Sequence, residues 1–133
     1  MANHVSREDL PAERMGDWEG RMGALGEYTV TFERIPADFP PGGADAFRGL
    51  PDDACQCPHW GYLFRGAFKL TYSDGHEEIV RGGQAYYAPP GHRFLALEEC
   101  ETIEFSPTHA LQEVQAVVGA NVEAFLTAGG SGR

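Results

Sequence analysis

Residues 82–91 read Gly-Gly-Gln-Ala-Tyr-Tyr-Ala-Pro-Pro-Gly, a short strand pattern enclosed by two turn signals. Glycine and proline at its ends favour turns, and the residues from Gln84 to Ala88 between them can form a strand. Similar short segments, each followed by glycine or another turn signal, occur on both sides of this stretch. Short strands at regular intervals are typical of an antiparallel sandwich or barrel. The sequence therefore predicts an all-β fold.

The strands expected from these patterns cover most of the middle of the chain. A hairpin turn is expected at Ser73 to His76, where Asp74-Gly75 is a turn dipeptide. A long loop is expected between 36 and 51, which contains Pro-Pro-Gly-Gly at 40–43. The predicted strands are 26–35, 59–64, 67–72, 77–80, 84–88, 93–97 and 101–105.

The two ends of the chain have different patterns. Residues 1–25 are polar and contain several glycines, which predicts an irregular N-terminal arm with at most a weak helical stretch around 7–15. Residues 107–128 are expected to form a C-terminal helical segment, with Ser106 as N-cap and Pro107 in the first turn. Gly119 is a candidate break in this helix. Its apolar stripe is Leu111, Val114, Val118, Val122 and Phe125.

Composition indicates a single folded domain and excludes some classes of partner. The chain has 133 residues, and 42% of them are hydrophobic, which is enough for a core. A net charge of −10 argues against nucleic-acid binding, which needs clustered Lys and Arg. No apolar stretch resembles a signal segment or a membrane span, so we expect a cytoplasmic protein without membrane contact. Three cysteines, an odd number, do not suggest a disulfide framework.

The segment Cys55-Gln56-Cys57-Pro58-His59 contains three potential ligands of a transition metal. On a regular strand, alternate side chains start about 6.6 Å apart and can bind one ion, which makes Cys57 and His59 the preferred pair. Cys55 starts about 13 Å from His59 and can join only if the chain bends, for which Pro58 is suitably placed. Asp53 is a weaker candidate. The alternative is that both cysteines are packing residues and the histidine is a hydrogen-bonded core residue.

The spacing of two motifs resembles that of the cupin superfamily. In the first, His59 is followed by six residues and Gly66, with an aromatic run before the glycine. In the second, Gly83 is followed by five residues and Pro-Pro-Gly at 89–91. The resemblance covers about residues 26–106 and implies a small β-barrel or jelly roll with a C-terminal helix. It also implies a metal or ligand site inside the barrel, and a homodimer.

The ligand positions depart from the pattern of that family. Counted from Gly66, the usual His-x-His pair falls on Asp53 and Cys55, and the usual Glu falls on His59. The usual histidine of the second motif falls on Phe94. His92 lies two residues before Phe94, so on a strand the two side chains point to the same face, and His92 could replace the usual histidine. The candidate metal ligands are therefore Cys57, His59 and His92, with or without Cys55.

These residues support three functional hypotheses. The first is a small metal-dependent enzyme that binds Zn or Fe and acts on a small organic molecule. The second is a non-catalytic cupin module that binds a small ligand or senses metal or redox state. The third is a closed structural zinc site with four protein ligands. Weak candidates for catalytic groups are Tyr86, Tyr87 and Glu104, the last only if it is turned inward and buried.

Overall fold

The computed structural model describes residues 3–129, in which nine strands and one α-helix form two antiparallel sheets and a helical cover. The strands are β1 (Ala12–Met15), β2 (Trp18–Leu25), β3 (Tyr28–Ile35), β4 (His59–Arg65), β5 (Ala67–Tyr72), β6 (Glu77–Arg81), β7 (Gln84–Ala88), β8 (His92–Ala96) and β9 (Cys100–Pro107). The helix is α1 (Thr108–Thr127). Short 3-10 turns occur at η1 (Arg7–Asp9), η2 (Gly43–Phe47) and η3 (Pro51–Asp53).

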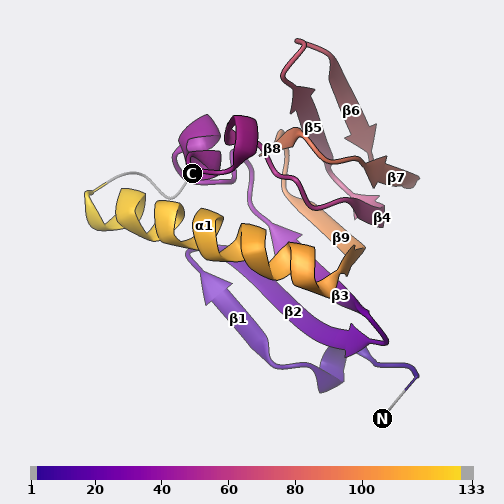
Figure 1. Ribbon diagram of the computed structural model, residues 1–133. Coiled ribbons are helices and arrows are strands. Elements are labelled where there is room, and N and C mark those ends of the chain that lie inside the picture. Colours follow the sequence, from indigo (N-terminus) through magenta and orange to yellow (C-terminus); the bar gives the residue numbers. More distant parts are fainter. Residues whose placement is uncertain (1–2, 130–133) are drawn as a thin grey trace.

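The strands divide into a six-stranded sheet, in the order β1-β2-β3-β9-β4-β7, and a three-stranded sheet, in the order β6-β5-β8. In Figure 1, the smaller sheet lies at one end of the molecule and α1 crosses in front of β1, β2 and β3. All pairings within the two sheets are antiparallel. This arrangement is jelly-roll-like, and it confirms the predicted all-β fold with a C-terminal helix.

Two clusters of buried side chains hold these layers together. The first joins the two sheets, because it contains residues of both, such as Leu63 of β4 and Phe68 of β5. The second lies between η2 and α1, and includes Phe47, Leu111 and Val122. Cys55 and Cys57 belong to this second cluster. The segment with the potential metal ligands is therefore buried between the helical cover and the sheets.

The prediction of an irregular N-terminal arm was wrong, because β1 and β2 extend the large sheet beyond β3. The glycines that argued against a strand make room for neighbouring side chains. A Cβ at Gly20 would overlap the ring of Trp18, and one at Gly23 would lie 2.7 Å from Cδ2 of Leu10. Glycine within a strand often marks such a close approach.

The helix begins one residue later than expected and has no break. Pro107 occupies the N-cap position without a side-chain cap, and the helix runs through Gly119 to Thr127. Ser106 does not cap the helix. It is the penultimate residue of β9, is fully buried, and hydrogen-bonds to His59 instead. None of the helices in the described residues is long and apolar enough to cross a membrane.

Candidate metal centre and adjoining cavity

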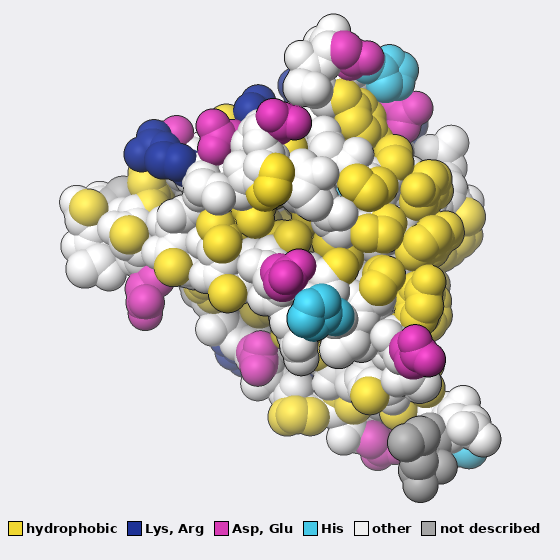
Figure 2. All heavy atoms as spheres, viewed as in Figure 1, with side chains coloured by type: hydrophobic (Ala, Val, Ile, Leu, Met, Phe, Trp, Pro, Cys, Tyr) yellow, Lys and Arg dark blue, Asp and Glu magenta, His cyan; other side chains and the backbone are white. Residues whose placement is uncertain are grey.

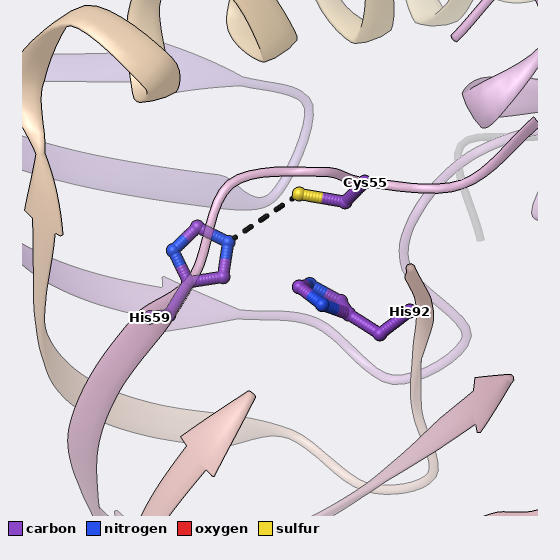
Figure 3. Close-up of side chains that lie close together, drawn as sticks. All are labelled: Cys55, His59 and His92. Atoms are coloured by element: carbon purple, nitrogen blue, oxygen red, sulfur yellow. Dashed lines mark hydrogen bonds between the residues drawn. The ribbon is translucent and has the colours of Figure 1, made fainter. Parts of the chain in front are cut away.

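Cys55, His59 and His92 come together from three segments of the chain. His59 is the first residue of β4 and His92 the first of β8, whereas Cys55 lies in the loop after η3. Cys55 forms an isolated antiparallel bridge with His92, in which its N–H donates a 2.8 Å hydrogen bond to the His92 carbonyl. One ligand atom from each of the three residues lies within 4.8 Å of the other two. Figure 3 shows the thiol and both rings directed toward one another.

The spacing of these atoms fits a metal ion. Sγ of Cys55 lies 3.5 Å from Nε2 of His59. In a tetrahedral zinc site with bonds of about 2.3 Å to sulfur and about 2.0 Å to nitrogen, these two atoms would be about 3.5 Å apart. Cys55 and His92 are each 3% exposed and His59 is 9% exposed. Burial of a thiol and two imidazoles around one point is the donor set expected for zinc, iron or copper.

Hydrogen bonds on the far side of each ring orient the histidines. Nδ1 of His92 donates to the carbonyl oxygen of Pro89 at 2.7 Å, because a carbonyl can only accept. This bond leaves a lone pair on Nε2 of His92. Nδ1 of His59 lies 2.7 Å from Oγ of Ser106 and 3.4 Å from Oε1 of Glu104. Such partners on the second ring nitrogen are typical of metal-bound histidines.

Cys57 does not join this group, so the ranking of the two cysteines is reversed. Its Sγ lies near the carbonyl oxygen of Pro58, at 3.4 Å, and 3.9 Å from Nδ1 of His59. Nδ1 is the ring nitrogen that faces Ser106, on the other side from Cys55. The prediction assumed a regular strand, but β4 begins only at His59 and the chain bends before it. That bend brings Cys55 to the histidines.

Two weaker candidates lie away from the ligand group. Asp53 is exposed, and its carboxylate accepts a hydrogen bond from the N–H of Gly49. Tyr87 is 49% exposed and stacks on the ring of Trp60. Tyr87 therefore belongs to the outer face of the large sheet, since neighbouring residues of a strand point to opposite faces.

Tyr86 and Glu104 face inward next to the ligand group. The Tyr86 hydroxyl donates a 2.6 Å hydrogen bond to Oε2 of Glu104, whose other oxygen is the one near His59. Strand β4 lies between β7 and β9, and its Gly61 pairs with Tyr86 on one side and with Glu104 on the other. A Cβ at Gly61 would lie 2.6 Å from the Tyr86 hydroxyl, so glycine here lets the tyrosine reach Glu104.

A cavity of about 330 Å³ lies between the inner face of the large sheet and α1. Glu104 and Tyr86 are part of its wall, and Glu104 connects the cavity to His59, whereas Cys55, His59 and His92 do not line it themselves. Sequence reasoning missed Glu33 and Trp18, which also line it, and Ser106 beside His59. Alternation along β3 puts Glu33 on the same face as Thr31, but which of the two faces is inward depends on the other strands. The cavity wall also contains Glu13, Met15, Met22, Thr31, Ile35, Phe39, Pro40, Phe47, Phe94, Thr102, Leu111, Val114, Gln115, Val118 and Gly119.

Burial disfavours the charged forms of the titratable groups in this region. It raises the pKa of the Cys55 thiol to about 12 and that of Cys57 to about 11. It lowers the pKa of His59 and of His92 to about 4. For Glu104, burial raises the pKa to about 7, against the opposing effect of the Tyr86 hydrogen bond. Both imidazoles are therefore neutral at pH 7, which is the form that binds a metal.

Comparison with known proteins finds similarity in structure alone. No protein-family model matches the sequence, and no curated protein matches it either. Among solved structures, an RmlC-like cupin from Shewanella frigidimarina is similar over 80% of this chain and 92% of its own, with 17% identity and a TM-score of 0.58. KdgF from Halomonas sp. is similar over 80% of this chain and 94% of its own, with 16% identity and a TM-score of 0.54.

An S161A mutant of the oxalate decarboxylase OxdC from Bacillus subtilis matches 77% of this chain, with 17% identity and a TM-score of 0.55. The match covers 28% of that longer chain. At these identities the likeness concerns the fold and does not extend to an activity. The strand order, the helical cover and these structural matches lead to one conclusion: this chain has the cupin fold.

Proposed function

We propose that this protein binds a divalent transition-metal ion, Zn²⁺ or Fe²⁺, through Cys55, His59 and His92, and acts as an enzyme on a small organic molecule. The observation that carries the proposal is the convergence of these three ligand atoms within 4.8 Å. A thiol and two imidazoles are soft and borderline donors that select such metals over Mg²⁺ and Ca²⁺. In the cytoplasm, where thiols stay reduced, Cys55 would remain available as a ligand.

Three protein ligands support an enzyme over a closed structural site. Structural zinc sites have four protein ligands, whereas catalytic sites have three and keep a position open. Cys57 Sγ lies next to Nδ1 of His59, the ring nitrogen on the side away from Cys55, so the described residues offer no fourth thiol or imidazole to the group. A bound ion would supply Lewis acidity toward a small molecule at its open position.

The residues beside the ligand group would handle protons and orientation. Glu104 lies between His59 and the Tyr86 hydroxyl, and its raised pKa lets it exchange a proton near pH 7. Tyr86 holds this carboxyl in place and lines the cavity. Residues of α1 form one wall of this cavity.

Metal analysis of protein purified without chelator tests the proposal. We expect about one equivalent of zinc or iron in the wild type, and loss of most of it in C55S and H92A. C57S is the matched control, since it removes a buried thiol that lies outside the ligand group. Equal metal loss in C57S and C55S, or a metal-free wild type that does not bind added Zn²⁺ or Fe²⁺, would overturn it.

A second candidate is a non-catalytic module that binds a small ligand without metal. The observation that favours it is the cavity itself, most of whose wall is apolar or aromatic. Ligand binding that is unchanged in C55S and H92A, with no turnover of the bound molecule by the metal-loaded wild type, would select this candidate.

We also propose that the protein is a homodimer through the outer face of the large sheet. Trp60, Tyr62 and Phe64 of β4 and Tyr87 of β7 are exposed there, and Figure 2 shows hydrophobic side chains gathered over this side. Strand β7 is an edge strand, next to this patch. A second copy is the favoured occupant, because an uncharged aromatic patch lets two chains of net charge −10 associate. Light scattering should give twice the chain mass, and the mass of one chain in a W60E variant.

A further inference from the structure

The cavity under α1 has an unusual balance of charge. Three carboxyl groups line it, those of Glu13, Glu33 and Glu104, and its wall contains neither lysine nor arginine. The chain has ten basic residues, and four of them surround a different carboxylate, that of Glu19. An anionic molecule in this cavity would find no positive side chain to pair with.

Glu33 presents a free hydrogen-bond acceptor to this cavity. Its Oε2 accepts a 2.9 Å hydrogen bond from Nε1 of Trp18, and Oε1 receives no hydrogen bond from the described residues. Glu33 sits diagonally across from Glu104 in the pairing of β3 with β9, where Thr31 is opposite Glu104. Two acidic side chains at this spacing repel each other, and burial raises the pKa of Glu33 to about 8. A positive charge between them would relieve both effects.

A buried hydroxyl without a partner also faces the same space. Thr102 is 3% exposed, lines the cavity, and its Oγ1 has no hydrogen-bond partner in the described part of the chain. Thr102 is directly opposite Glu33 in the sheet. Buried polar atoms are rarely left unpaired, so this hydroxyl marks a place where a ligand's polar group would sit.

Aromatic rings form the remaining wall near these polar groups. Trp18 stacks on Phe39, with ring centroids 6.3 Å apart, and both rings line the cavity. Phe94 and Tyr86 line it from the other strands. Ring faces attract cations, and an aromatic wall with a nearby carboxylate is a suitable environment for an ammonium group.

We propose that this cavity binds an organic cation, an amine with an apolar or aromatic body. Its ammonium group pairs with the carboxylate of Glu33, which releases its proton to solvent as the cation binds. The ammonium group lies within reach of Thr102 and Glu104, and the body of the amine packs against the rings and α1. This names the substrate class of the function proposed above and rests on it in that respect, but the binding itself needs no metal ion.

Calorimetric titration with three matched probes tests this inference: phenethylamine, 2-phenylethanol and phenylacetate, each on metal-free and metal-loaded protein. We expect the amine to bind at least about tenfold more tightly than the alcohol, and the acid to bind most weakly. Amine binding that persists in C55S, without metal, would keep the ligand class even if the metal proposal failed. No binding of the amine at millimolar concentration, or tighter binding of the alcohol or the acid, would overturn it.

Two variants show where the amine binds. E33Q keeps the size of the side chain and should lower amine affinity at least about tenfold while leaving affinity for the alcohol nearly unchanged. E123Q makes the same substitution at an exposed glutamate on α1 and should change neither the affinity for the amine nor that for the alcohol. G119M should weaken amine and alcohol alike, because Gly119 lines the cavity and a Cβ there meets only open space. Unchanged amine affinity in both E33Q and G119M would contradict the inference.

Discussion

The Tyr86 hydroxyl donates a 2.6 Å hydrogen bond to Glu104, and this bond connects the cavity with the candidate metal ligands. The other oxygen of Glu104 lies 3.4 Å from Nδ1 of His59. A group that binds in the cavity can therefore affect His59 through two contacts. The residues on this path come from β7, β9 and β4, which are neighbours in the large sheet.

Removing the Tyr86 hydroxyl should destabilise the protein and leave the metal ligands in place. Y86F takes the hydrogen bond from a buried carboxyl, which should lower the free energy of unfolding by about 1–3 kcal/mol. Urea unfolding measures this change, and metal content should stay at the wild-type level. Y87F is the matched control, because the Tyr87 ring lies exposed on the outer face. A Y86F protein as stable as Y87F would show that the bond does not contribute.

Ser106 should act as a positioning residue for His59. S106A removes the oxygen 2.7 Å from Nδ1 of His59, so the ring loses a partner that orients it. Loss of such partners typically weakens metal binding about 10- to 100-fold. Competition with a chromophoric chelator measures the affinity for Zn²⁺. S73A, a substitution in the hairpin turn between β5 and β6, should bind as the wild type does. Equal affinity in S106A and S73A would exclude this role.

Glu19 should contribute strongly to stability, although it does not line the cavity. It is 3% exposed and forms ion pairs with Arg14 at 3.1 Å and Arg34 at 3.2 Å, with two more arginines nearby. E19Q leaves these cations without their shared partner and should lower the free energy of unfolding by about 2–3 kcal/mol. D45N breaks an ion pair whose two side chains are each 71% exposed, and should change stability by at most about 0.5 kcal/mol. Thermal unfolding of both variants compares them directly.

The pH dependence of stability should reveal the buried state of Glu33. Its pKa in the folded protein is raised from 4.5 to about 8, so the folded state holds a proton that the unfolded state has released. The stability that this residue contributes is therefore present below pH 4.5 and is lost as the pH rises to about 8. E33Q lacks this loss. Between pH 5 and pH 9, its free energy of unfolding should therefore rise by about 2–4 kcal/mol relative to that of the wild type.

This comparison uses chelator-treated protein, because a bound metal ion would change the titration of its histidine ligands. The histidines titrate in the same experiment. Their folded pKa of about 4 lies below 6.5, so their contribution is present above pH 6.5 and is lost as the pH falls toward 4. Wild type and E33Q share this effect, and it cancels in the difference between their unfolding free energies. A difference that does not change with pH would mean that Glu33 is ionised in the folded protein.

Local patterns predicted the strands between residues 59 and 107 well, since each strand there is bounded by its own turn. The predicted segments 67–72 and 84–88 match β5 and β7. The N-terminal strands were missed because Gly20 and Gly23 look like strand breakers until Trp18 and Leu10 are placed beside them. That packing depends on residues whose positions are set by the rest of the sheet.

The candidate site was predicted in composition but not in geometry. Cys55, His59 and His92 were all named from ligand chemistry and motif spacing, and the structure brings them together. The alternation of side chains on a regular strand favoured Cys57 over Cys55 as a ligand. This prediction was wrong because the chain before His59 is not a strand. Glu104 was considered only if it faced inward, a choice that alternation alone does not make.

The sequence by itself determined the series of short antiparallel strands, the cupin-like motif spacing and the presence of soft ligands at 55–59 and His92. These follow from covalent neighbours, whose turn chemistry and spacing act over a few residues. Only the tertiary structure decided which thiol meets the histidines and that Glu33, Thr102 and Glu104 share a cavity without a basic residue. Such contacts depend on which strands pair and which sheet face α1 covers, and pairing joins residues far apart in the chain.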